Sequence, residues 1–403
     1  MLCGCSTYLP CKEDAPMTAK LHDLKQLYFC REDTFSVDPS QDGSGYSTIH
    51  AQDITFTPTM DVIERPLQNA SMTPIAPVNG AKGGTLAFKV EARGTGAAYG
   101  KSGADVGTAA AYGEYGELLK GVLGGVHFGT GSAVVTGTSA TEFTTITAHG
   151  PTFELGDCIY VENQIRRVKS RSGDVLTLSR ALSAAPTSGS TIYAGANYYP
   201  ADEGHLSFSF VIKQGDEQWM LQGCKGTVAF EGATANGRPL FAFSFMINDW
   251  KTSNKSALGT LDINATSRPV GPVLLGSTLQ YATGSHPVAE FSFNANITAE
   301  ATPSIAGTQG RSNFVVTKRA AAGTIKPLWS STQLGHFVSG SAQELLLSVG
   351  STGSNAYAIS VTSASFNAMP SIENLNSQLF MNMPFAVVQA NSGSHRDFKI
   401  TLF

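Results

Sequence analysis

Hydrophobic and polar residues alternate along much of the chain, which is the pattern of β-strands with one buried face. Ile54 and Phe56 alternate with polar neighbours over residues 53–57, and Leu86, Phe88 and Val90 do so over residues 84–92. The same period of two returns with stronger apolar residues at 206–212 and 239–247, and the C-terminal stretch from about residue 268 continues it at low charge. We therefore predict a mainly β protein built from half-buried antiparallel strands.

Residues 112–123 carry the one helical pattern that stands out. Tyr115, Leu118, Leu119, Val122 and Leu123 repeat at the spacing of a single helix face, and two glycines follow at once. This spacing predicts a core helix laid across a sheet, and not a partner-binding or membrane helix.

Two segments interrupt the strand pattern. Residues 65–84 are long, polar and rich in proline and glycine, which predicts an extended loop or hairpin arm that reaches away from the body. Residues 132–199 form a run of short strands between Gly/Ser-rich stretches, as an inserted small β module would. The basic residues of this module, Arg166, Arg167, Lys169 and Arg171, are balanced by nearby carboxylates, so we expect a solvated strand face and not a phosphate site.

Charge and composition exclude several classes of protein. Only 14% of the 403 residues are charged, and 27 basic against 31 acidic residues give a net charge of −4, which argues against a dedicated nucleic-acid binder. No apolar run is long enough for a transmembrane helix, and the N-terminus lacks a signal-peptide pattern, so we expect a cytoplasm-like compartment of synthesis and no membrane insertion. A surface this poor in charge suits a protein that buries much of its exterior against copies of itself.

Candidate chemistry is sparse. The eight histidines are scattered, the Gly100-Lys101-Ser102 stretch lacks the spacing of a phosphate loop, and no serine has the flanking glycines of a nucleophile elbow. The adjacent carboxylate pairs Asp202-Glu203 and Asp216-Glu217 lie at predicted turns and do not indicate an acid/base pair. We therefore expect no enzyme activity and no cofactor.

The six cysteines do not indicate a metal site either. A site made by Cys3, Cys5 and Cys11 with a distant histidine would match no common zinc spacing. Cys158 and Cys224 stand alone in strand-like stretches, where a buried free thiol is the usual role. Residues 1–16, which hold three of the six, are predicted to be a flexible cysteine-rich arm.

The order of several motifs resembles a known family. These are KQLYFCREDTFSVDP (25–39), ITFTPTMDVIERPL (54–67), GGTLAFKVEARG (83–94) ahead of the helix YGELLKGVLGG (115–125), EQWMLQGCKGTVAF (217–230) with GRPLFAFSFMI (237–247), and two C-terminal stretches at 293–329 and 345–366. In this order they resemble the tail tube proteins of long-tailed phages, the siphophages, over most of residues 17–403. The cysteine-rich arm and the inserted module depart from the simplest members.

The resemblance implies a fold and a domain organisation. The fold would be a β-sandwich subunit that forms a barrel with its neighbours, with one core helix, a small inserted β module and a C-terminal β module. The tail-tube domain would span residues 17–131 and 200–267, interrupted by the module at 132–199 and followed by the C-terminal module at 268–403.

The resemblance also implies a function. The chain would be a structural virion protein, assembled in the host cytoplasm, whose homohexameric rings stack into a tube for delivery of genome DNA. Its partners would be copies of itself, the tail tip, tape-measure and tail terminator proteins, and DNA that passes transiently and without sequence preference.

Residue roles follow from the same resemblance. The arm at 65–84 would contact the next ring, with Arg65, Pro66, Pro74, Pro77 and Gly80 as candidates. Acidic residues beside the hairpin strands would line the channel; the candidates are Glu91, Asp216, Glu217 and Glu231. Six chains at −4 each carry −24, which keeps DNA from adhering to the wall.

Two other functions fit the same sequence less well. Another β-rich phage component, such as a capsid decoration or tail-tip protein, would share the low charge and the self-association. A glycan-binding or glycan-cleaving β-sandwich would need a secretion signal, an acidic pair or surface tryptophans, whereas Trp219, Trp250 and Trp329 all lie in or near strand-like runs.

Overall fold

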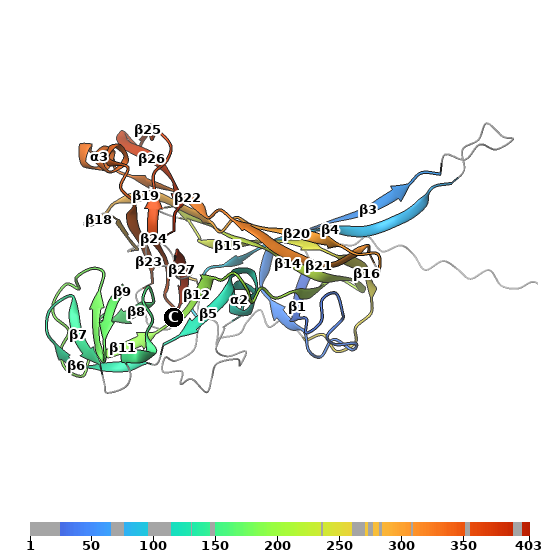
Figure 1. Ribbon diagram of the computed structural model, residues 1–403, viewed down its shortest axis with the longest axis horizontal. Coiled ribbons are helices and arrows are strands. Elements are labelled where there is room, and N and C mark those ends of the chain that lie inside the picture. The colour runs from blue at the N-terminus through green and yellow to red at the C-terminus, as the bar shows by residue number, and fades with distance from the viewer. Residues whose placement is uncertain are drawn as a thin grey trace, which may run out of the picture.

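The computed structural model describes residues 25–65, 76–95, 114–129, 131–145, 150–234, 237–259, 271–272, 277–281, 284–307, 309–350, 355–389 and 397–403. The cysteine-rich segment 1–16 and the arm candidates Pro66 and Pro74 lie outside these residues. The protein is mainly β, as the alternation predicts, with a large sheet, a closed barrel and short helices (Figure 1).

The first half of the chain forms a four-stranded sheet whose order is β3-β4-β15-β14. Its strands are β3 (Ala51–Ile63), β4 (Val78–Glu91), β15 (Leu240–Ile247) and β14 (Glu217–Thr234). Phe88 stacks on Phe243 and Phe245 with ring centroids 5.5 and 6.0 Å apart, on the face that packs into the core. The alternate residues are polar or small, which explains the period of two.

A sharp bend in β14 turns this sheet into a sandwich. Gly223 adopts φ 65°, and the residues before it pair with β13 (Phe208–Gln214) and β16 (Asp249–Ser253). Beyond β13 follow β1 (Lys25–Arg31) and β2 (Ser47–Ile49). The buried carboxylate of Glu32 accepts hydrogen bonds from the Gly223 amide and the Ser209 hydroxyl, at 2.8 and 2.7 Å, so it holds the bend in place.

Helix α2 (Gly116–Leu123) closes one end of this core. Its described turns begin at Gly116, later than the predicted 112, and Leu118, Leu119, Val122 and Leu123 are buried as the spacing predicts. Gly121 is required here, because a Cβ at this position would lie 2.3 Å from the Phe208 ring.

The segment predicted as an inserted module contains a closed six-stranded barrel with its own core. Its strands are β6 (Ser132–Gly137), β7 (Glu142–Thr145), β8 (Cys158–Val161), β9 (Gln164–Ser172), β10 (Val175–Leu178) and β11 (Thr191–Ala194), with the short helix η2 (Gly150–Thr152). The flanking strands β5 (Gly124–Phe128) and β12 (Ala196–Pro200) pair with each other, so residues 196–199 lie in the main sheet and not in the barrel.

The prediction that the four basic residues of this module form a solvated strand face is wrong for two of them. Arg166 is buried and donates to the carbonyl of Ala181 at 2.9 Å, and Arg167 forms a two-pronged ion pair with Glu344 at 2.9 and 3.0 Å. Lys169 and Arg171 are exposed. Arg166 is held by acceptors of the barrel module itself, from Gln164, Ile165 and Ala181, whereas Arg167 is covered because Glu344 of the C-terminal half lies against this side of the barrel.

The C-terminal half repeats the pairing order of the first half. Its elements are β17 (Thr278–Tyr281), β18 (Gly284–His286), β19 (Val288–Asn294), β20 (Ile297–Pro303), β21 (Arg311–Arg319), β22 (Ala322–Pro327), α3 (Ser331–Ser339), β23 (Gln343–Val349), β24 (Tyr357–Ser365), β25 (Ser371–Leu375), β26 (Gln378–Val387) and β27 (Phe398–Leu402).

In the sheet of this half, the hairpin β19–β22 pairs through β22 with β26, and β26 pairs in turn with β25 and the end of β24. This is the order of the first half, where the hairpin β3–β4 pairs through β4 with β15, and β15 pairs with β14. The second sheet repeats as well: β18-β17-β23-β24-β27 matches β2-β1-β13-β14-β16. We call the two halves unit 1 (25–253, which includes the barrel) and unit 2 (278–402).

The two units are joined edge to edge. The outer edge of β14 in unit 1 pairs with β19 in unit 2, with Phe230 opposite Phe293. The result is one continuous sheet in the order β3-β4-β15-β14-β19-β22-β26-β25.

Helix α3 is absent from the sequence-based prediction. Ser330 caps its start by accepting a hydrogen bond from the Gln333 amide at 3.3 Å, and Gly340 ends it in the left-handed conformation with φ 63°. Its nine residues carry a weak apolar stripe, because only Leu334 and Phe337 are packed against the core. Its position after the hairpin of unit 2 matches that of α2 after the hairpin of unit 1.

Candidate assembly surface

One face of the continuous sheet is polar across both units. In an antiparallel ladder, residues opposite each other project from the same face. The row Thr55, Ala87, Ser244 and Thr227 crosses unit 1, and the row Ser292, Thr324 and Pro384 crosses unit 2. None of these seven side chains is buried, whereas the opposite face carries the aromatic core.

A triad of one lysine and two carboxylates lies on this polar face in unit 1. Lys89 on β4 lies 3.3 Å from Glu231 on β14 and 3.7 Å from Asp53 on β3. Asp53 occupies a β-bulge with φ 55°, which turns its carboxylate toward the lysine. Each member is at least one-third exposed, so the triad contributes little stability and mainly sets the local charge at −1.

The same triad recurs in unit 2. Lys326 on β22 lies 3.0 Å from Glu373 on β25 and 3.1 Å from Glu290 on β19. Lys326 donates hydrogen bonds to Glu373 and Glu290, and these bonds raise the pKa of Lys326. Glu290, like Asp53 in unit 1, lies at a register shift of its strand, here between Val288 and Phe291. The two triads therefore mark equivalent positions, and each leaves one net negative charge on the polar face.

The structure brings together two of the four acidic candidates. Glu91 and Glu231 both lie opposite Leu240, on either side of it, so they share the polar face. Glu91 pairs with Arg238 at 2.9 Å, and Glu231 belongs to the triad of unit 1. Asp216 and Glu217 are exposed at the turn between β13 and β14, at the opposite end of β14 and in the second sheet.

The segment predicted as a loop or arm is a hairpin arm that leaves the body. Strands β3 and β4 continue past the sheet, so Gly80 and residues 78–84 are strand and not loop (Figure 1). Arg65 and Pro77 flank the part of the arm outside the described residues. Met60, Val62, Ile63 and Val78 expose 40, 57, 58 and 49% of their surface, which is unusual for apolar side chains so close together.

The base of the arm is fixed by contacts from both units. The indole Nε1 of Trp250 donates to the Thr59 carbonyl at 3.2 Å. The side chain of Gln309, at the tip of the hairpin β20–β21, accepts from the Lys82 amide at 2.7 Å and donates to Asp249 at 3.0 Å. The pairing of β4 with β15 ends at Gly84, opposite Ile247. Beyond that point, these side-chain contacts hold β4 in place of the missing strand.

A second group of exposed apolar residues lies at the far edge of the sheet. Met369, Ile372, Leu375 and Leu379 expose 74, 58, 46 and 48% of their surface. They belong to β25, β26 and the segment before β25, at the end of the molecule opposite the arm (Figure 1). The two free edges of the continuous sheet are therefore both apolar in part.

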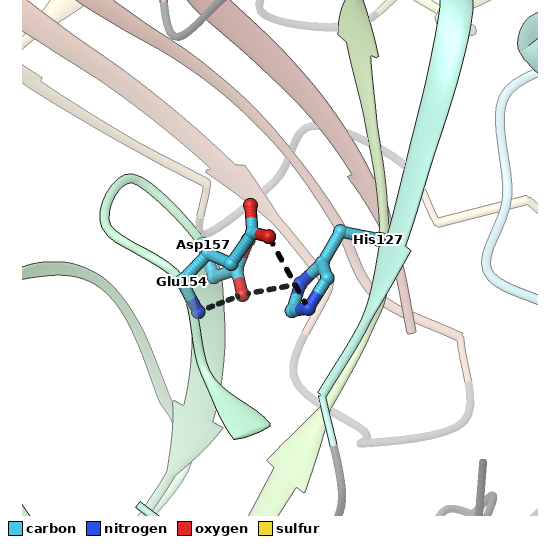
Figure 2. Close-up of side chains that lie close together, drawn as sticks. All are labelled: His127, Glu154 and Asp157. Atoms are coloured by element: carbon cyan, nitrogen blue, oxygen red, sulfur yellow. Dashed lines mark hydrogen bonds and ion pairs between the residues drawn. The ribbon is translucent and has the colours of Figure 1, made fainter. Parts of the chain in front are cut away.

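The barrel is fastened to the main sheet by a polar cluster. Figure 2 shows His127 of β5 pointing toward Glu154 and Asp157, which precede β8. His127 Nδ1 donates to Asp157 at 2.8 Å, and the Glu154 amide donates to the same carboxylate oxygen at 2.7 Å. The other oxygen accepts from Lys399 Nζ of β27 at 2.7 Å, and both Asp157 and Lys399 are buried.

This cluster has the residue types of a metal site but not its electrostatics. The ligand atoms of His127, Glu154 and Asp157 lie within 4.8 Å of one another. Both oxygens of Asp157, however, already accept hydrogen bonds, one of them from a buried ammonium group that repels a second cation. Burial opposes ionisation of Asp157, but the His127 hydrogen bond and the Lys399 charge outweigh it and lower the pKa of Asp157. The cluster is a structural bridge.

Sequence reasoning missed this bridge and the second triad. Asp157 lies 242 residues from Lys399, and no short motif joins them. The second triad could be found by noting that a long hairpin precedes a helix in both halves of the chain.

The described helices are too short and too polar to cross a bilayer.

The comparisons with known proteins agree with the architecture. A model of the phage tail tube protein family matches residues 23–379, which include unit 1, the barrel and unit 2 as far as the start of β26. No curated protein matches the sequence. Because the match covers most of the chain, it extends to the duplicated sheet as well as to the first hairpin and helix. The chain therefore belongs to the phage tail tube protein family and is a structural component of the virion tail that assembles with other subunits into a tube.

Proposed function

We propose that this subunit forms closed rings that stack into the tube of a long, non-contractile tail, and that the tube encloses a channel for genome DNA. The observation that supports this most strongly is the continuous sheet, which has one polar face and two free edges among the described strands. A long sheet with open edges is prone to uncontrolled pairing, and closure into a ring removes those edges.

The polar face of the sheet is the proposed channel wall. Its two triads each carry a net charge of −1, and Glu91 is neutralised by Arg238. A mildly acidic wall with short polar side chains repels the phosphate backbone weakly, and the described residues of this face offer it no cation cluster to bind. DNA would then pass without being held.

The six-fold arrangement that the sequence resemblance implies is proposed here as six sandwich units around the channel. The ring would be assembled in the host cytoplasm on a tail tip and tape-measure complex and closed by a terminator protein, which are the partners that the same resemblance implies.

The hairpin arm is the proposed contact to the next ring. Its apolar residues Met60, Val62, Ile63 and Val78 are exposed in the isolated subunit, and burial of such residues stabilises an interface at about 25 cal/mol per Å². Of the candidate contact residues, Arg65, Pro77 and Gly80 lie in the described part of the same arm, and Pro66 and Pro74 lie outside the described residues.

Electron microscopy of the purified protein tests this function. We expect rings, or tubes stacked from them, with a central channel. Changing Met60, Val62, Ile63 and Val78 to serine and replacing residues 66–75 by a Gly/Ser segment of equal length should leave rings intact and abolish stacking. The same replacement of residues 390–396 is the matched control and should leave both intact. A protein that forms neither rings nor tubes, even with a tail tip supplied to nucleate them, would refute the proposal.

A further inference from the structure

The duplicated sheet carries a template for the contact between two copies of this chain. Within one chain, the outer edge of β14 in unit 1 pairs with the first hairpin strand of unit 2, β19. At the ends of the continuous sheet, β25 of unit 2 pairs only with β26, and β3 of unit 1 pairs only with β4, among the strands that the structure describes. These two edges are the counterparts of the pair that is already joined.

The triads fix which residues are equivalent. Glu231 of unit 1 corresponds to Glu373 of unit 2, and Asp53 corresponds to Glu290. Phe230 directly precedes Glu231, as Ile372 precedes Glu373. Phe56 follows Asp53 by three residues, as Phe293 follows Glu290.

The ladders support this alignment independently. Phe56 lies opposite Leu86, which lies opposite Phe245; Phe293 lies opposite Gly323, which lies opposite Phe385. Phe245 precedes the end of β15 by two residues, and Phe385 precedes the end of β26 by two.

Equivalent side chains on β14 and β25 differ in exposure, as expected if β25 lacks the neighbouring strand that β14 has. Phe230 is 1% exposed, because it packs between Phe241 and Phe291 with ring centroids 5.4 and 6.0 Å away. Its counterpart Ile372 is 58% exposed. Phe291 is supplied by unit 2 across the in-chain junction, and no described strand lies in the corresponding place beside Ile372.

We propose that β25 of one copy pairs with β3 of a second copy in the register of the in-chain junction, so that a ring of six units is closed by three chains. Ile372 then lies opposite Phe56 of the neighbour, as Phe230 lies opposite Phe293. Ser371 lies opposite Thr57, as Ala229 lies opposite Asn294. Each junction between chains repeats the junction within a chain.

This stoichiometry changes what the outside of the tube carries. The barrel of residues 132–194 interrupts unit 1 and has no counterpart among the described strands of unit 2. A ring of three chains therefore has a channel with pseudo-six-fold symmetry and three barrels on its circumference. The inference rests on the proposed ring, because only a closed ring requires both edges to be paired.

Disulfide trapping tests the junction. The double variant Ser371→Cys with Thr57→Cys, in a background with serine at Cys3, Cys5, Cys11 and Cys30, places two thiols opposite each other in neighbouring chains, within reach of a disulfide. We expect oxidation of assembled protein to give a ladder that ends at the trimer, about 127 kDa for three chains of 42.4 kDa. The pair Ala229→Cys with Asn294→Cys is the positive control and should close within one chain.

The register control is Ser371→Cys with Thr55→Cys, which shifts one thiol by two residues to a diagonal position about 7–8 Å away. It should cross-link far less than the matched pair. Equal cross-linking of both pairs, or tubes without any cross-link in the matched pair, would overturn the proposed register.

Native mass measurement of unmodified rings, with electron-microscopy class averages, tests the chain count without any substitution. Three barrels around a ring of about 127 kDa are expected. Rings of six chains with six barrels would overturn the inference while leaving the proposed function intact. The absence of rings under all conditions would overturn both.

Discussion

Replacing Lys399 by methionine would leave the buried carboxylate of Asp157 without its cation. The two side chains are 2 and 0% exposed and lie 2.7 Å apart, so water cannot take the place of the lost ammonium group. Breaking a buried ion pair from one side typically costs about 3–5 kcal/mol. We expect a loss of this size in the free energy of unfolding, because methionine keeps the aliphatic length of lysine and removes mainly the charge.

Urea denaturation of the unassembled protein, followed by circular dichroism, measures this loss. The matched control is Lys318→Met on the exposed strand β21, which should cost less than about 0.5 kcal/mol. The double variant Lys399→Met with Asp157→Asn removes both charges and should be more stable than the sum of the single losses predicts. If Lys399→Met costs no more than Lys318→Met, the argument from the buried pair is wrong.

The pH dependence of the same variant follows from the pKa of Asp157, which is lowered in the folded protein. A carboxylate with a depressed pKa stabilises the fold at every pH above its unfolded value of about 3.9, and the contribution is lost as pH falls through the folded pKa. In Lys399→Met the buried carboxyl loses a charge that lowers its pKa and takes up its proton at a higher pH than in the wild type, so the difference in stability between the two proteins should be largest at neutral pH and shrink on acidification. A difference that grows on acidification would contradict the assignment.

Three further predictions address the two junctions and the thiols. Ile372→Glu should abolish ring closure by placing a charge in the apolar junction, whereas Val338→Glu, at a still more exposed position on α3, should leave assembly seen by light scattering unchanged; equal effects would count against the junction. Phe230→Ala should cost about 3–5 kcal/mol in urea denaturation because it opens a cavity between the two units, and a cost below 1 kcal/mol would show that the site can collapse. Burial and nearby carboxylates raise the pKa of Cys30 to about 11, so its alkylation by iodoacetamide at pH 8 should be roughly 100-fold slower than that of a free thiol, and a normal rate would contradict the raised pKa.

The local pattern of the sequence determined the strands and their buried faces. The alternation of Phe241, Phe243 and Phe245 predicts which side of β15 packs into the core, and all three are buried. Leu118 and Leu119 likewise predict the buried face of α2. These predictions succeed because side-chain periodicity depends only on backbone geometry, with a period of two in strands and 3.6 in helices. The motif order also indicated a phage tail tube protein, which the family model confirms.

The tertiary structure alone decided which strands are neighbours. Phe230 and Phe293 read as ordinary core aromatics, and only the pairing of β14 with β19 shows that they join two units. The duplication escaped the sequence analysis because its two halves share strand order and ladder register but few identical residues: Lys89 matches Lys326, whereas Asp53 matches Glu290.

The polar bridge between barrel and sheet was hidden for a related reason. His127, Asp157 and Lys399 come from β5, the segment before β8, and β27, and each looks like an isolated polar residue in its own stretch. Periodicity reports which side of an element is buried, but it carries no information on what that side meets. Contacts between distant segments depend on the closure of the whole sheet, so the triads, the bridge and the two free edges became visible only in the folded chain.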